Sequence, residues 1–154
     1  MSNVLFPQFA TQLRTRWLKD LVDELLAALR NLDLPMIQML AMLPEDKAKG
    51  WLMERMESFL TAVEAGQALQ WEMKRLAQWE SGEIPGIPKN SLHPTDVPLY
   101  HSAQRAALQK FVGRFSRDPN LRVELLAELE GHFQSIFAEA MRTHQRLKMT
   151  KSPR

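Results

Sequence analysis

The apolar residues of this chain recur at intervals of three and four positions, and this spacing constrains the fold more than any other feature. Such spacing gathers side chains on one face of an α-helix, whereas a half-buried strand requires alternation with a period of two. β-Branched residues are sparse, and no segment alternates apolar and polar residues between hairpin turns. The sequence therefore predicts an all-α fold, a single bundle of five to six helices with bundle-like or globin-like packing.

Proline and glycine set the predicted helix boundaries. Pro44 starts one helix, Gly66 ends it, and the pair Asp118-Pro119 separates the last two helices. The last helix would be about 45 Å long at 1.5 Å per residue, so its end is expected to project or to pack on a partner. The helices are predicted over residues 8–31, 33–43, 44–66, 67–80, 95–115 and 119–148.

The length of 154 residues fits one domain, predicted over residues 1–148, with a basic tail over residues 149–154. Residues 82–94 contain three prolines and two glycines, which excludes a helix there. A loop of this length inside a domain is often functional, and the alternative is a simple crossover.

The composition excludes several classes of chemistry and of location. The chain has no cysteine, so it forms no disulfide, thiolate metal site or thiol nucleophile. No apolar run approaches the roughly 18 residues of a membrane span, and the N-terminus does not resemble a secretory signal. We therefore expect a cytoplasmic protein without a membrane partner. The net charge of +2 is too weak to indicate nucleic acid as a partner.

The four histidines are the candidates for binding a cofactor or a metal ion. A haem-binding reading would use His101 or His93, and the competing reading makes both of them ordinary surface or boundary residues. Glu128 and His132 share a helix face, but a dimetal bundle site needs two Glu-x-x-His motifs, which the chain lacks. We read this pair as a solvated helix contact, and the sequence predicts no cofactor, no metal and no catalytic residue.

Two other groups of residues are candidate partner-binding sites. Lys110, Arg114 and Arg117 are spaced by four and three, so they form a basic stripe that would meet an acidic partner or phosphates. The alternative is a solvated helix end, where cations are favoured by the helix dipole. Met36 and Met39 lie in a methionine-rich segment that would either line an adaptable binding groove or fill an irregular core.

Three segments carry a family resemblance: an early helix with Arg14, Trp17 and Leu21, a helix ending in Leu60, Val63 and Gly66, and a helix over residues 100–112. Their order, with the long last helix, resembles the N-terminal, non-haem, globin-like sensory domain of stressosome proteins of the RsbR type. The resemblance implies a domain that dimerises and signals by contact, and it implies no catalytic residue. We expect this chain to depart from the family pattern, in which the long last helix leads to an output module.

The leading hypothesis is therefore a non-catalytic bacterial sensory or adaptor domain that acts by protein–protein contact. It would form a homodimer and bind another signalling protein. The first alternative is a globin-like protein that binds haem or a small apolar ligand near His101 or His93. The second alternative is a binder of nucleic acid or of an acidic protein through the basic stripe.

Overall fold

The computed structural model of the chain describes residues 4–32, 43–81 and 96–151. These ranges contain helices and no strand, which confirms the all-α prediction. Six of the helices have 12 residues or more, and α7 is a single turn. The helices are α1 (Leu5–Arg16), α2 (Leu18–Arg30), α4 (Glu45–Glu64), α5 (Ala68–Ser81), α6 (Asp96–Gln109), α7 (Val112–Phe115) and α8 (Pro119–Lys151). In the described ranges, no helix has the length and apolar character needed to cross a membrane.

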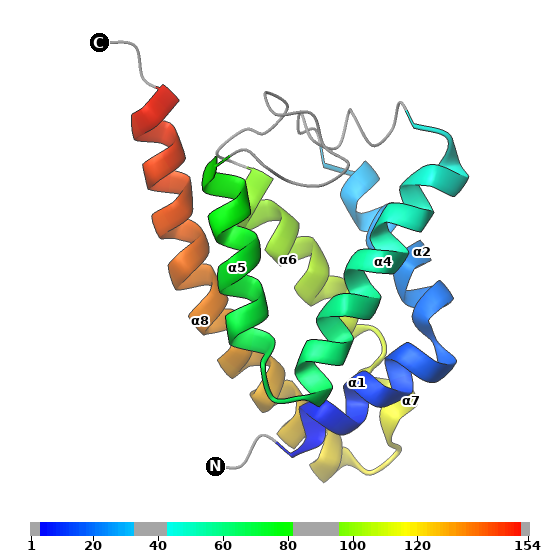
Figure 1. The fold of residues 1–154 in the computed structure, drawn as a ribbon. Helices are drawn as coiled ribbons and strands as arrows, with labels where there is room; N and C mark the ends of the chain where they lie inside the picture. The colour runs from blue at the N-terminus through cyan, green and yellow to red at the C-terminus, as the bar shows by residue number, and fades with distance from the viewer. Residues whose placement is uncertain (1–3, 33–42, 82–95, 152–154) are drawn as a thin grey trace.

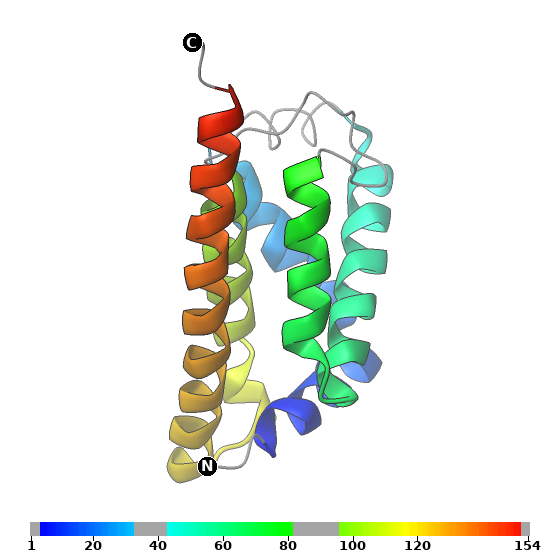
Figure 2. The same ribbon diagram turned by 60° about the vertical axis from the view of Figure 1, so that its left-hand side comes forward.

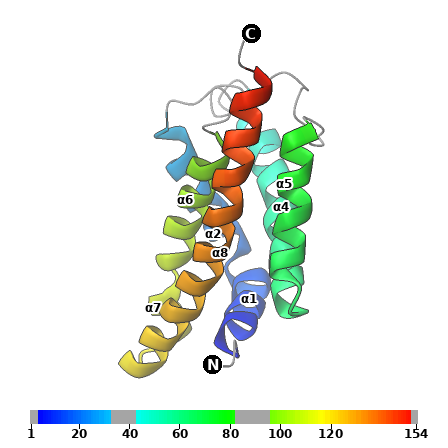
Figure 3. The same ribbon diagram turned by 90° about the vertical axis from the view of Figure 1, so that its left-hand side faces the viewer.

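Five helices surround the core of the bundle. Helices α2, α4, α5, α8 and α6 follow one another around it, and α6 packs against α2 to complete the circuit (Figure 1). Helix α1 crosses the lower end of the bundle in this view and packs on α4 (Figures 1 and 2). Helices α5 and α8 lie side by side and run in the same direction (Figures 1 and 3). One outer side of the bundle is therefore made by this pair alone.

The core is formed by the apolar stripes that the spacing predicts for most of these helices. Its largest fully buried side chains are those of Phe9, Leu13, Leu21, Leu25, Leu29, Leu52, Phe59, Phe111 and Phe133. At roughly 1.5–3 kcal/mol for each fully buried side chain of this size, the stripes supply the main favourable term in folding.

The helix predicted over residues 8–31 is interrupted, and that prediction is wrong at one position. Trp17 has φ −128° and ψ 16°, outside the helical region, so the chain turns from α1 into α2. Its ring packs against Phe111, with ring centroids 6.5 Å apart. The segment predicted over residues 95–115 is interrupted in the same way at Lys110 and Phe111, between α6 and α7. Neither break contains proline or glycine, and the apolar spacing continues through both, so the sequence did not predict them.

The boundaries that proline and glycine mark are confirmed. Pro44 precedes α4, and Pro119 is the first residue of α8. Gly66 follows α4 with a φ of +72°, a conformation that costs glycine little and other residues more. Helix α8 continues through Lys151, three residues beyond the predicted end.

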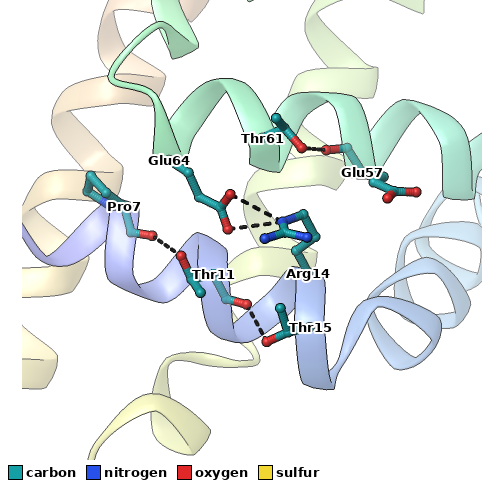
Figure 4. A network of polar contacts seen from close by, with 7 residues as sticks. All are labelled: Pro7, Thr11, Arg14, Thr15, Glu57, Thr61 and Glu64. Atoms are coloured by element: carbon teal, nitrogen blue, oxygen red, sulfur yellow. Dashed lines mark hydrogen bonds and ion pairs between the residues drawn. The ribbon is translucent and has the colours of Figure 1, made fainter.

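Polar contacts hold α1 in its position across the bundle. The Arg14 guanidinium donates from Nε to both carboxylate oxygens of Glu64 on α4, at 3.0 and 3.2 Å (Figure 4). Thr11 and Thr15 each donate to the carbonyl four residues earlier, as Figure 4 also shows. Arg14, one of the residues that carry the family resemblance, therefore links two helices.

Candidate functional site

A buried carboxylate lies between two histidines in the interior of the bundle. Glu72 of α5 is 1% exposed and His101 of α6 is 2% exposed. The His101 ring donates from Nε2 to Glu72 Oε2 at 3.0 Å, because an ionised carboxylate can only accept. On the other side, His132 Nε2 of α8 lies 3.9 Å from Glu72 Oε1, which is longer than a hydrogen bond. Three helices thus meet at one polar centre.

The histidines keep Glu72 ionised despite its burial. Burial raises the pKa of Glu72, but the charge and hydrogen bond of His101, together with the contacts of His132, lower it by more. The resulting pKa is lowered from 4.5 to about 2. The interior of this bundle therefore contains a carboxylate that stays charged over the whole physiological range.

These positions correct two sequence-based readings. His101 is buried and hydrogen-bonded, so it is not the surface or boundary residue of the competing reading. The pair Glu128 and His132 is not a solvated contact, since His132 points into the bundle against Phe6 and Phe59. His93, Met36 and Met39 lie outside the described residues, as does the loop over 82–94.

The face of α5 that packs inward also differs from the prediction. Spacing places Leu69, Met73 and Leu76 in the core, but only Leu76 is buried. Leu69 and Met73 are 45% and 40% exposed, and Glu72 takes the inward position instead. Helix α5 is therefore rotated about its axis relative to the prediction. The contacts of Glu72 with two histidines inside the bundle offset the cost of burying its charge.

Two arginines and three aromatic rings lie next to this polar centre. Arg55 of α4 stacks on Trp51, with Cζ 5.0 Å from the ring centroid, and also approaches Trp71 and Tyr100. Arg75 of α5 lies 5.0 Å from the Trp71 ring. Sequence reasoning missed this group because its members come from three helices. A local signal existed, since Trp51 and Arg55, and likewise Trp71 and Arg75, are four residues apart and share a helix face.

A groove of about 820 Å³ opens between the start of α8, the start of α1 and the α4–α5 turn. One of its acids is already used: Glu128 accepts hydrogen bonds from the backbone N–H groups of Leu5 and Phe6, at 3.0 to 3.2 Å. Glu128 thereby caps α1, whose own N-cap residue provides no side-chain cap. The groove is lined by Phe6, Pro7, Val63, Gly66, Ala68, Leu69, Val123, Glu124, Ala127, Glu128, Gly131, His132 and Ser135.

Two of the three cations in the predicted basic stripe form ion pairs with acids of the same chain. Lys110 Nζ lies 2.8 Å from Glu24 Oε2, and Arg114 Nη1 lies 3.0 Å from Asp20 Oδ2. Both acids belong to α2, whereas Arg117 is exposed just beyond α7. The first two cations of the stripe therefore pair the α6–α7 turn and α7 with α2.

Where the structure describes the chain, no three histidine or acidic residues are arranged to hold a metal ion. His101, a candidate haem ligand only in the first alternative, directs its Nε2 at Glu72 and does not line the groove. Comparison of the chain with protein-family models, curated proteins and solved structures gives no match in any of the three. The resemblance to sensory domains of the RsbR type therefore stays a prediction.

Proposed function

We propose that this chain is a non-catalytic sensory or adaptor domain that forms a homodimer through its outer α5/α8 face. We define this face by Leu69 and Met73 of α5 and by Val123, Ala127, Gly131 and Ser135 of α8. In this proposal the dimer signals in the bacterial cytoplasm by contact with another signalling protein. The signalling role rests on the sequence resemblance, and the dimer rests on the exposed apolar side chains.

The observation that supports the dimer is a run of uncharged side chains left in solvent on two adjacent helices. All six residues of the α5/α8 face are exposed, and Val123 is 66% exposed. Five of them line or border the groove, which gives the face a hollow as well as an apolar character. Exposed apolar patches rimmed by polar residues are typical of protein–protein contact surfaces.

The charge along α8 favours a second copy of the chain as the occupant. The first half of α8, residues 119–135, contains three acids and one arginine. The second half, residues 136–151, contains four basic residues and one acid. Two copies related by a two-fold axis near the middle of α8 would place each acidic half beside a basic half. Gly131 and Ser135 lie nearest that axis, and their small side chains would allow the helices to approach closely.

Light scattering and sedimentation over a range of protein concentrations would test the dimer. We expect the wild-type chain to be dimeric. Ala127→Lys should raise the dissociation constant at least about 100-fold, because it places a cation in the interface beside the basic half of the partner's α8. The matched control is Ala27→Lys, which places the same charge at an exposed alanine of α2 and should leave the dimer intact.

A charge reversal would test the antiparallel arrangement. Glu124→Lys should weaken the dimer, and adding Arg142→Glu in the same chain should strengthen it again, because the two residues lie in opposite halves of α8. A wild-type chain that is monomeric at every concentration would contradict the homodimer. A dimer that resists Ala127→Lys would place the interface on another surface.

A further inference from the structure

Two guanidinium groups from different helices converge on the same tryptophan ring. Cζ of Arg55 lies 5.9 Å from the Trp71 ring centroid, and Cζ of Arg75 lies 5.0 Å from it. Arg55 also lies 5.9 Å from the ring of Tyr100, which is buried. Two cations therefore lie beside one ring, and both are partly buried.

Two like charges beside one partly buried ring destabilise each other unless an anion lies near both. Burial lowers the pKa of Arg75 and the nearby Arg55 lowers it further, while Glu72 acts in the opposite direction. Neither arginine forms an ion pair with any acid of the described residues. Glu72 is already held by His101 and His132, so it cannot serve as a full counter-ion for both arginines.

Unused hydrogen-bond donors lie at the same place. Nε of Arg55 and Nε of Arg75 are both buried and have no hydrogen-bond acceptor among the described residues. Gln104 is 1% exposed, and its amide nitrogen and oxygen also lack partners in these residues. Gln104 follows Tyr100 by four positions on α6, so the two side chains share one helix face. Buried donors without acceptors are rare in native proteins, and each calls for a ligand or a water.

We infer that Arg55 and Arg75 bind a small oxyanion, a carboxylate or a phosphate, beside Trp71 and Tyr100. A guanidinium group presents its donors in a planar fork that matches both kinds of oxyanion. One anion between the two arginines would remove their repulsion and satisfy the buried Nε donors. The binding site is separate from the α5/α8 face. If the chain is the sensory domain proposed above, the bound oxyanion would be the signal to which it responds.

Thermal unfolding in different anions would test this inference. The probes are sodium phosphate, sodium acetate and sodium benzoate, each compared with sodium chloride at the same ionic strength so that general screening cancels. We expect at least one probe to raise the melting temperature of the wild-type protein in a saturable way. The probe with the lowest apparent dissociation constant would identify the oxyanion class.

Variants of the two arginines connect that response to this site. Arg55→Gln and Arg75→Gln should each raise the apparent dissociation constant at least tenfold. In chloride, Arg75→Gln should not lower the melting temperature, because it relieves the repulsion. The matched control is Arg30→Gln, which changes an exposed arginine that pairs with Glu45 at 3.4 Å and should keep the wild-type response.

Intrinsic fluorescence gives a second readout, since Trp51 and Trp71 both contact Arg55. Arg75→Lys keeps the charge without the planar fork and should bind the anion more weakly than the wild-type protein while remaining folded. Two results would overturn the inference. One is a wild-type protein that responds to none of the probes beyond its response to chloride. The other is an unchanged response in both glutamine variants.

Discussion

The molecule contains two groups of basic residues that differ in how their charge is balanced. Lys110 and Arg114 lie in solvent and pair with Glu24 and Asp20 of α2. Arg55 and Arg75 are partly buried, stack on aromatic rings, and lie near a single acid that two histidines already contact. A buried basic residue without a counter-ion indicates a binding site for an anion, whereas a surface cation that pairs with an acid of the same chain does not.

The largest expected effect comes from the acid of the buried group. Glu72→Gln should lower the free energy of unfolding by about 3 kcal/mol or more, because it leaves His101 and His132 without the carboxylate between them. Urea unfolding at neutral pH would measure this loss. The surface control is Glu24→Gln, which removes the exposed partner of Lys110 and should cost less than about 1 kcal/mol. Equal losses in the two variants would remove the energetic difference between the groups.

The pH dependence of stability should separate the two groups next. The pKa of Glu72 is about 2 in the folded protein, below its ordinary value of 4.5. A depressed carboxyl pKa contributes stability that is fully present above pH 4.5 and is lost as the pH falls toward about 2. The lowering of the pKa from 4.5 to about 2 corresponds to about 3 kcal/mol of unfolding free energy.

Acid titration of the unfolding free energy would show this loss in the wild-type protein and in Glu24→Gln. In Glu72→Gln the same pH range should give a flatter curve, since the titrating carboxyl is gone. A steep loss that persists in Glu72→Gln would assign the acid sensitivity to other groups.

The smallest effect should come from the surface pairs. A double-mutant cycle with Arg114→Ala and Asp20→Ala should give a coupling energy of about 0.2–1 kcal/mol that shrinks as salt is added. Denaturant unfolding of the four proteins at low and high ionic strength would measure it. A coupling energy above that range and insensitive to salt would mean that the stripe stabilises the fold as strongly as a buried pair.

The sequence predicted the fold class and the boundaries that proline and glycine mark, because these depend on local backbone chemistry. It did not predict the breaks at Trp17 and at Lys110, where packing rather than residue type ends the helix. It also chose the wrong inward face for α5. A carboxylate is stable in a core only when polar partners lie beside it. For Glu72 these partners are His101 and His132, which lie on other helices that are distant in the sequence.

The same reason explains the uneven outcome for the candidate sites. The basic stripe was visible because its members are spaced along one stretch of chain, and the structure shows its first two members paired with α2. Glu72, Arg55 and Arg75 were overlooked because they come together only in three dimensions. One local signal did exist: Glu72 lies four residues before Leu76, at a position on the same helix face.

The cap that Glu128 provides for α1 has a consequence for the order of folding. The hydrogen bonds from Leu5 and Phe6 to this carboxylate span 123 and 122 residues of sequence. Helix α1 is synthesised before the other described helices, but its N-terminal amide groups gain their acceptor only after Glu128, the tenth residue of α8, has been synthesised. Contacts of such long range slow folding because a large loop must close before they form. Of the described helices, the one that is synthesised earliest is therefore among the last to be completed.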